Sequence, residues 1–264
     1  MLNKYSKKFS LTSFGGVDWI WLTGFEQVIT NGVSTYYAID DAPTYNAIDD
    51  APKSRIVTFN HFWIYQDYQN LPYPYSWTTK YIGGYFYFSS ENYFYKTYSN
   101  FTVINYYPSS IAAYRQIAFD PARSKFYVAS QNFPRIDVFD TSCSLLQSIN
   151  LGSKQPFGLV FFNGNIYAGV LNSNQVIVIQ NGLVSKYFTV NQCPVREFQI
   201  VSITVDTFGY FALSCFNSNL IVVYDSNGNY MNTYIQTSAY PYISAIDADG
   251  RFVIVTSKSL DIYY

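Results

Sequence analysis

The chain has 264 residues, of which 49% are hydrophobic and 12% are charged, and its formal net charge is −1. This balance argues against nucleic acid as a partner, because nucleic-acid binding needs clustered lysine and arginine, and the one basic cluster, Lys4, Lys7 and Lys8, is interpreted as a solvated end. No apolar run approaches the roughly 18 residues of a membrane helix, so we expect no membrane span.

Aromatic residues are unusually abundant, at 20% of the chain, with 28 tyrosines and 22 phenylalanines. Tyrosine suits the half-buried surface of a sheet and also offers an adaptable contact surface to solvent. So many rings cannot all lie in one core, and we therefore expect some of them to be exposed. Exposed rings in quantity indicate contact with another protein or with a sugar.

The first predicted strand in chain order lies at residues 25–32, after an N-terminal extension at residues 1–24. Its sequence, FEQVITNG, resembles LLQSINLG at 145–152, which is interpreted as a fourth strand followed by its turn. We expect this early strand to complete the last repeated unit of the chain.

Residues 38–55 contain the phrase AIDDAP twice. The second copy parallels SAIDADGRFVIVTS from Ser244, so it is interpreted as the turn after the first strand of a unit, with a second strand starting at Ile56. The upstream copy is interpreted as a duplicated loop insertion. The alternative is a calcium site, but calcium needs six or more oxygens from a shaped loop and nothing nearby completes that set. We therefore expect no metal and no cofactor.

From residue 85 onward the chain repeats a pattern of an apolar strand, a short polar loop, an alternating strand, a tight turn and a more polar strand. Copies start at residues 85, 126, 166, 210 and 252, with spacings of 41, 40, 44 and 42 residues. This period is typical of propeller blades. The sequence therefore predicts an all-β chain, a single six-bladed β-propeller over residues 1–264, whose blades are four-stranded and antiparallel. An N-terminal strand would complete the C-terminal blade and remove its exposed edge.

The stretches YVASQNFPRIDVFDTSCSLLQSI, NSNQVIVIQNG and NSNLIVVYDSNG resemble the NHL repeat of six-bladed propellers, closely over residues 115–264 and loosely over 50–114. The resemblance implies the fold but no single function, since this fold serves ligases, lyases, sensors and binding modules. Peptide-processing lyases of this kind use several histidines with a metal, whereas this chain has only His61, which is interpreted as structural.

Three cysteines bear on the compartment. Cys193 precedes the first strand of its blade and Cys215 ends the second, so both are expected at one rim, where a disulfide is geometrically reasonable. Cys143 lies in a turn at the opposite rim and is expected to be free or to form an intermolecular bond. The disulfide implies an oxidising, extracellular compartment, and Asn100 in the sequon Asn-Phe-Thr permits glycosylation. The alternative is three free thiols in a cytosolic protein.

Loops between second and third strands gather at the rim of Cys193, together with the loops between blades. Amides beside flat rings are groups that hold sugars or extended peptides, although asparagine and proline also simply make turns. The predicted ligand- or partner-binding rim comprises Asn132, Phe133, Phe157, Asn172, Asn174, Asn217, Asn219, Tyr240 and Tyr242.

These features favour a non-catalytic extracellular propeller, such as a self-associating adhesive, matrix or filament subunit, or a ligand-binding module, whose partners are other protein subunits or a glycan. The N-terminal sequence does not resemble a secretory signal, so either the protein stays inside the cell or this is a mature or excised piece of a secreted chain, and we expect the second. Two alternatives remain open: a six-bladed hydrolase or lyase with an unrecognised site at the channel mouth, and an intracellular NHL scaffold for protein partners.

Overall fold

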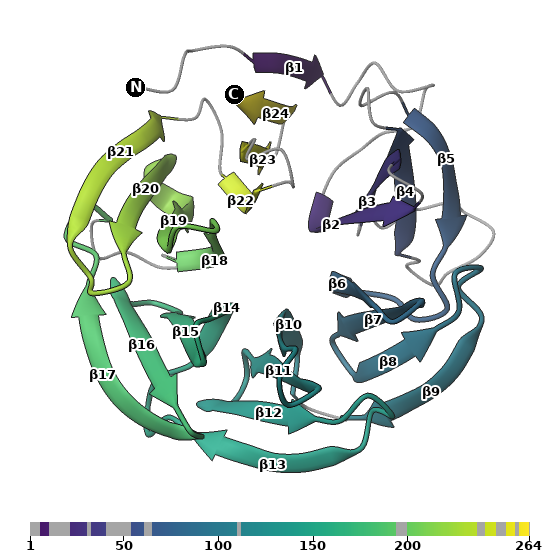
Figure 1. Cartoon of the computed structure of the whole chain (residues 1–264), viewed down its shortest axis with the longest axis horizontal. Coiled ribbons are helices and arrows are strands. Elements are labelled where there is room, and N and C mark those ends of the chain that lie inside the picture. The colour runs from purple at the N-terminus through teal and green to yellow at the C-terminus, as the bar shows by residue number, and fades with distance from the viewer. Residues whose placement is uncertain are drawn as a thin grey trace.

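The computed structural model describes residues 6–10, 22–30, 33–40, 54–60, 65–109, 112–193, 200–236, 241–246, 252–256 and 259–263. These residues form six four-stranded antiparallel sheets, which are arranged as blades around a central axis (Figure 1). The predicted all-β propeller with six four-stranded blades is therefore confirmed.

Five blades are built from four consecutive strands, and the sixth takes its outer strand from the N-terminal part of the chain. Blade 1 contains β2 (Leu22–Thr30), β3 (Val33–Asp40), β4 (Arg55–Asn60) and β5 (Tyr65–Asn70), and blade 2 contains β6 (Ser76–Ile82), β7 (Tyr85–Ser90), β8 (Tyr93–Thr97) and β9 (Val103–Pro108). Blade 3 contains β10 (Tyr114–Asp120), β11 (Lys125–Ser130), β12 (Arg135–Phe139) and β13 (Leu145–Asn150), and blade 4 contains β14 (Pro156–Phe162), β15 (Asn165–Val170), β16 (Gln175–Gln180) and β17 (Leu183–Thr189). Blade 5 contains β18 (Ile200–Val205), β19 (Tyr210–Cys215), the short 3-10 helix η2 (Phe216–Ser218), β20 (Leu220–Asp225) and β21 (Tyr230–Gln236), and blade 6 contains β22 (Pro241–Ile246), β23 (Phe252–Thr256), β24 (Ser259–Tyr263) and β1 (Ser6–Ser10).

Tight turns between β-rich segments explain why the chain forms hairpins. In blade 4 the turn residues Asn163 and Gly164 have φ values of 51° and 80°, and Asn181 and Gly182 have 52° and 78°. Two-residue hairpin turns of this kind need positive φ at both central positions, which asparagine and glycine adopt at least cost. Asn181 and Gly182 therefore form the two-residue turn of the β16–β17 hairpin, in which Gln180 pairs with Leu183.

The ring is closed by β1, which pairs antiparallel with β24 from Ser6 opposite Tyr263 to Ser10 opposite Ser259. An N-terminal strand thus completes the C-terminal blade, as predicted, but the predicted residues were wrong. Residues 25–30 belong to β2, the innermost strand of blade 1, and the expected extension at 1–24 contains the closing strand. Strands β2 and β3 pair antiparallel as far as Thr30 opposite Val33, so the segment that was assigned to a fourth strand belongs to the innermost strand of blade 1, and residues 31–32 lie outside the described residues.

Blade 1 also differs from its expected register. Five of the six predicted second strands lie where expected, but Ile56 belongs to β4, the third strand of its blade, and the second strand is β3. The AIDDAP copies therefore connect the second and third strands of blade 1 and do not follow a first strand. Residues 41–53 lie outside the described residues, so the interpretation of a duplicated insertion stays a prediction.

Neighbouring blades pack through distinct cores. Between blades 2 and 3 the buried side chains are mainly rings, with Tyr87 4.2 Å from Phe126 and Phe94 4.6 Å from Phe139 between ring centroids. Between blades 3 and 4 the core is mainly valine, isoleucine, leucine and alanine. Burial of these faces supplies most of the stabilisation of the ring, at about 25 cal/mol per Å² of apolar surface. A large share of the abundant aromatic residues is therefore core.

Candidate functional site

The asparagine-rich turns lie together on one rim of the ring, as expected. In blade 3 the backbone N–H of Asn132 donates to Ala112 O at 3.3 Å, which ties the β11–β12 turn to the segment that enters β10. In blade 4, Leu171 N–H donates to Gln155 O at 2.8 Å in the equivalent place. In blade 5 the equivalent connection is covalent, since Cys193 and Cys215 form a disulfide with their Cα atoms 5.6 Å apart.

Several predicted rim residues have a clear local role in the backbone. Asn172 and Asn219 both have a φ of 55°, a left-handed conformation that asparagine tolerates better than most residues. Asn174 accepts a backbone hydrogen bond from Val190 at 2.6 Å through its carbonyl, and Asn217 lies within η2. The turn-forming interpretation of these asparagines is thus supported at the level of geometry.

The aromatic residues of the predicted rim have different surroundings. Phe133 lies in the β11–β12 turn, and the Arg135 guanidinium is 5.1 Å from the centre of its ring. Phe157 is buried at the start of β14. Tyr242 belongs to β22, whereas Tyr240 and His61 lie outside the described residues.

A shared backbone irregularity marks the rim end of every innermost strand. Pairing with the second strand is shifted directly after the first residue of the innermost strand in all six blades, as in a β-bulge. The residues at these shifts are Thr23, Trp77, Arg115 with Gln116, Phe157 with Gly158, Val201 and Tyr242. Bulges bend a strand and redirect side chains, and they are frequent next to functional sites.

The bulge residues of blades 2 to 5 meet at the channel mouth. The rings of Trp77 and Phe157 are 5.9 Å apart and nearly perpendicular, and both pack in one cluster with Val201. The Arg115 guanidinium is 3.9 Å from the centre of the Trp77 ring and donates through Nε to Gln131 Oε1. Side chains of blades 2, 4 and 5 thus form one cluster at the mouth of the channel, and we call it the mouth cluster.

Gln116 links blade 3 to the two blades that follow it. Its Oε1 accepts from the backbone N–H of Leu159 at 2.9 Å and of Ile203 at 3.3 Å, and its Nε2 donates to Ile203 O at 3.3 Å. One blade 3 side chain therefore joins blades 4 and 5.

The titratable groups beneath the rim are structural. Asp137, which is 0% exposed, accepts hydrogen bonds from the Tyr114 hydroxyl at 2.7 Å and from the Ser148 hydroxyl, and Arg135 Nε lies 3.1 Å from its Oδ1. Burial, and then the negative charge of Asp137, raise the pKa of Tyr114 well above its ordinary value. Arg135 thereby links this buried carboxylate to the ring of Phe133 on the rim.

Cys143 lies at the opposite rim, as predicted, in the turn between β12 and β13. It is free but only 3% exposed, and burial raises the pKa of its thiol to about 12. The structure thus shows the free thiol, the first of the two expected states, and its burial offers little sulfur surface for an intermolecular bond.

The outer strands carry a second candidate surface. On four successive blades the outermost strand exposes two large hydrophobic side chains, and we call this set the outer band. The outer band comprises Ile104 and Tyr106 on β9, Leu145 and Leu146 on β13, Leu183 and Tyr187 on β17, and Tyr230 and Met231 on β21.

Sequence reasoning found the turns of the rim but missed Trp77, Arg115 and Gln116. The repeat is defined from its second strands onward, and these three residues lie in first strands, β6 and β10. Among the described residues no three histidine, cysteine or acidic side chains are grouped as metal ligands, and no helix is long and apolar enough to cross a membrane.

Comparison with known proteins supports the fold. No family model matches the sequence, and no curated protein matches it. Virginiamycin B lyase from Staphylococcus aureus is similar in structure, with a TM-score of 0.69, 13% identity, and coverage of 98% of this chain and 99% of the lyase. A protein of unknown function from Bacteroides thetaiotaomicron has a TM-score of 0.69 and 15% identity, over 97% of this chain and 72% of that one. The WD40 propeller domain of Doa1 has a TM-score of 0.65 and 11% identity, over 92% and 79%. At these identities the likeness concerns the fold alone.

Proposed function

We propose that the protein is a non-catalytic, self-associating interaction module, a structural subunit that contacts neighbouring copies through the outer band. The observation that carries this proposal is the exposure of paired hydrophobic side chains on four successive edge strands. Exposed apolar side chains that recur on neighbouring edge strands are a feature of protein contact sites.

The backbone of the same strands supports the proposal. Each of β9, β13, β17 and β21 is the last strand of its sheet (Figure 1), so one row of its N–H and C=O groups has no sheet neighbour. Proteins that remain monomeric usually place charges or proline on such edges to prevent pairing. Lys186 is the only charged residue in these four strands. The closing strand β1, by contrast, carries Lys7 and Lys8 in its sequence.

An extracellular location is part of this proposal. It is supported by the disulfide between Cys193 and Cys215, because disulfides persist mainly in oxidising compartments. Asn100 is exposed in the turn after β8, so its side chain is accessible for glycosylation. We also propose an NHL-type repeat as the origin of the blades, on the strength of the motifs in blades 3 to 5.

The enzymatic alternative has less support from the geometry. A variant of the S. aureus lyase in which a histidine is replaced by alanine is described as catalytically inactive, and this chain has a single histidine. Trp77, Phe157 and Val201 form a cluster at the mouth of the channel, and the Arg115 guanidinium packs on the Trp77 ring. A tryptophan, a phenylalanine and a valine offer no nucleophile or general base.

Sedimentation and electron microscopy of the purified protein test self-association. We expect concentration-dependent oligomers or fibres for the natural chain. The double variant Leu146→Lys and Leu183→Lys places charges on two edge strands and should return it to a monomer. Phe208→Lys is the matched control, since Phe208 is 84% exposed but lies in the turn between β18 and β19. A natural chain that stays monomeric at every concentration would refute the proposal, and so would equal loss of assembly in the control.

A further inference from the structure

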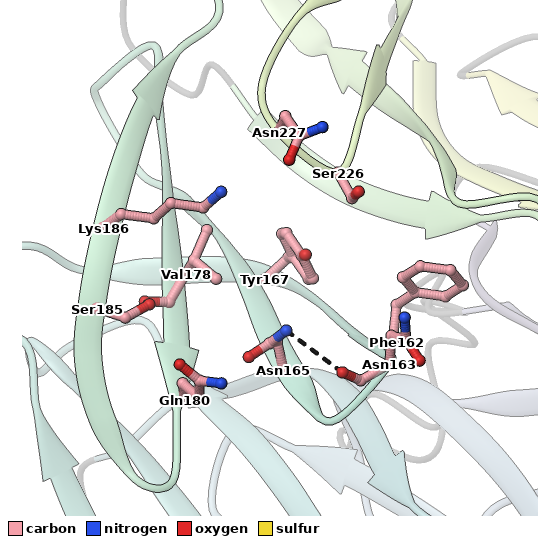
Figure 2. Close-up of a pocket in the computed structure, with 10 residues that line it drawn as sticks. All are labelled: Phe162, Asn163, Asn165, Tyr167, Val178, Gln180, Ser185, Lys186, Ser226 and Asn227. Atoms are coloured by element: carbon pink, nitrogen blue, oxygen red, sulfur yellow. Dashed lines mark hydrogen bonds between the residues drawn. The ribbon is translucent and has the colours of Figure 1, made fainter.

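A polar hollow lies between blades 4 and 5, at the rim opposite to the asparagine-rich turns. Its volume is about 410 Å³, within the range of roughly 300–1,000 Å³ that small-molecule sites occupy. Figure 2 shows that side chains enter it from β15, from β16 and β17, and from the turn between β20 and β21. Neighbouring blades must pack together to form it.

Polar groups without a partner converge on this hollow. The side-chain amides of Asn163, Gln180 and Asn227, the Ser226 hydroxyl and the Lys186 ammonium face it (Figure 2). Within the described part of the chain none of these five groups makes a side-chain hydrogen bond or ion pair. The hollow therefore presents several donors and acceptors that a ligand could satisfy.

Other groups give the hollow a defined shape. Asn165 is oriented by a hydrogen bond of 3.3 Å from its Nδ2 to the carbonyl oxygen of Asn163. Tyr167 is buried beneath it, with its ring centre 4.3 Å from that of Phe211. The ring of Phe162 packs against Gly209, where an added Cβ would lie 3.0 Å from it. A half-buried ring near the oriented amide of Asn165 thus lies at the edge of the hollow.

The chemistry of the lining selects among ligand classes. None of the ten described residues that line the hollow is acidic, so the lining offers no carboxylate to a cation. Lys186 is their single positive charge, whereas polyanions require several. An apolar ligand would leave the amides desolvated and unpaired, at a cost of about 1–3 kcal/mol for each buried group.

We propose that this hollow binds a neutral sugar of one or two residues. Amide side chains both donate and accept, which matches adjacent sugar hydroxyls that do the same. The C–H face of a pyranose ring would pack on the half-buried ring of Phe162 through dispersion contacts. The hollow shares β17 with the outer band, but Gln180 and Asn227 lie outside the band, so a variant at these two residues tests sugar binding without changing the band.

The site can be tested with a glycan array that is probed with labelled protein. Sugars that bind on the array are then measured free in solution by saturation-transfer NMR. We expect binding of at least one neutral glycan by the natural chain. The double variant Gln180→Ala and Asn227→Ala removes two amides that make no side-chain bond within the described residues. It should weaken binding by about tenfold or more, since two hydrogen bonds of about 1 kcal/mol are lost.

Two controls locate the ligand and fix its charge. Asn191→Ala removes an exposed amide at the asparagine-rich rim and should leave binding unchanged. Lys186→Met should weaken a neutral sugar only slightly. The proposal is overturned if no neutral glycan binds, if the Asn191 variant loses binding while the double variant keeps it, or if only acidic sugars bind and Lys186→Met abolishes their binding.

Discussion

Reduction of the disulfide between Cys193 and Cys215 should destabilise the protein by a calculable amount. The bond closes a loop with a sequence separation of 22 residues between β17 and the end of β19. In the chain-entropy account the unfolded chain loses about 2.1 cal/mol/K plus 1.5R ln n through the cross-link, which gives about 3.4 kcal/mol at 25 °C for this loop. Both sulfur-bearing side chains are fully buried, so the thiols would still fill the same core.

Equilibrium unfolding in urea, followed by tyrosine and tryptophan fluorescence with and without a reductant, measures this loss. With an m value of about 3 kcal/mol/M, the midpoint should fall by about 1 M on reduction. The Cys143→Ala background prevents disulfide exchange and serves as the control. Equal midpoints in the two conditions would refute the reasoning, and so would free Cys193 and Cys215 thiols in the protein purified without a reductant.

Three further predictions follow from the closing strand, the buried carboxylate and the free thiol. Deletion of residues 1–10 leaves β24 as an unpaired edge, so we expect a Tm several degrees lower and aggregation in differential scanning fluorimetry; an unchanged melting curve would contradict the assigned closure. Tyr114→Phe removes a donor from fully buried Asp137 and should cost about 1–3 kcal/mol in urea unfolding. Burial in the folded protein raises the pKa of Cys143 from about 9 to about 12. As the pH rises, the Cys143 thiol therefore ionises first in the unfolded chain, which stabilises that state, so the free energy of unfolding should fall between about pH 9 and 12. Cys143→Ala should make that fall smaller, and the remainder should come from buried tyrosines such as Tyr87, whose pKa burial raises to about 12 as well.

The register of blades 2 to 6 could be predicted because each blade repeats the same sequence of apolar strands and polar turns. Blade 1 could not, since its resemblance to SAIDADGRFVIVTS placed Ile56 in a second strand when it lies in the third. Similar residues precede an apolar strand in both places. A second strand and a third strand of a blade have the same apolar character, so the sequence does not distinguish them. Hydrophobic alternation fixes which face is buried, but it does not fix which neighbour a strand pairs with.

The channel-mouth residues were missed for a different reason. Trp77 and Arg115 lie at bulges, where one strand contains extra residues relative to its partner, and no residue type marks such a shift. Their contact with Phe157 joins three blades, so it depends on the closure of the ring. The polar hollow is of the same kind, because Asn163 and Asn227 belong to turns of adjacent blades and each resembles an ordinary turn residue in the sequence.

Composition alone gave too strong an argument for exposed rings. The largest fully buried side chains are all tyrosines and phenylalanines, among them Tyr87, Tyr95 and Phe126. Bulky rings fill the interfaces of blades 2 and 3, where blades 3 and 4 use aliphatic residues. The case for self-association therefore depends on where apolar side chains lie and not on how many rings the chain has. A propeller equally rich in tyrosine, but with charged outer strands, would have no outer band. The double variant Leu146→Lys and Leu183→Lys adds such charges to two of the four strands while it keeps every ring.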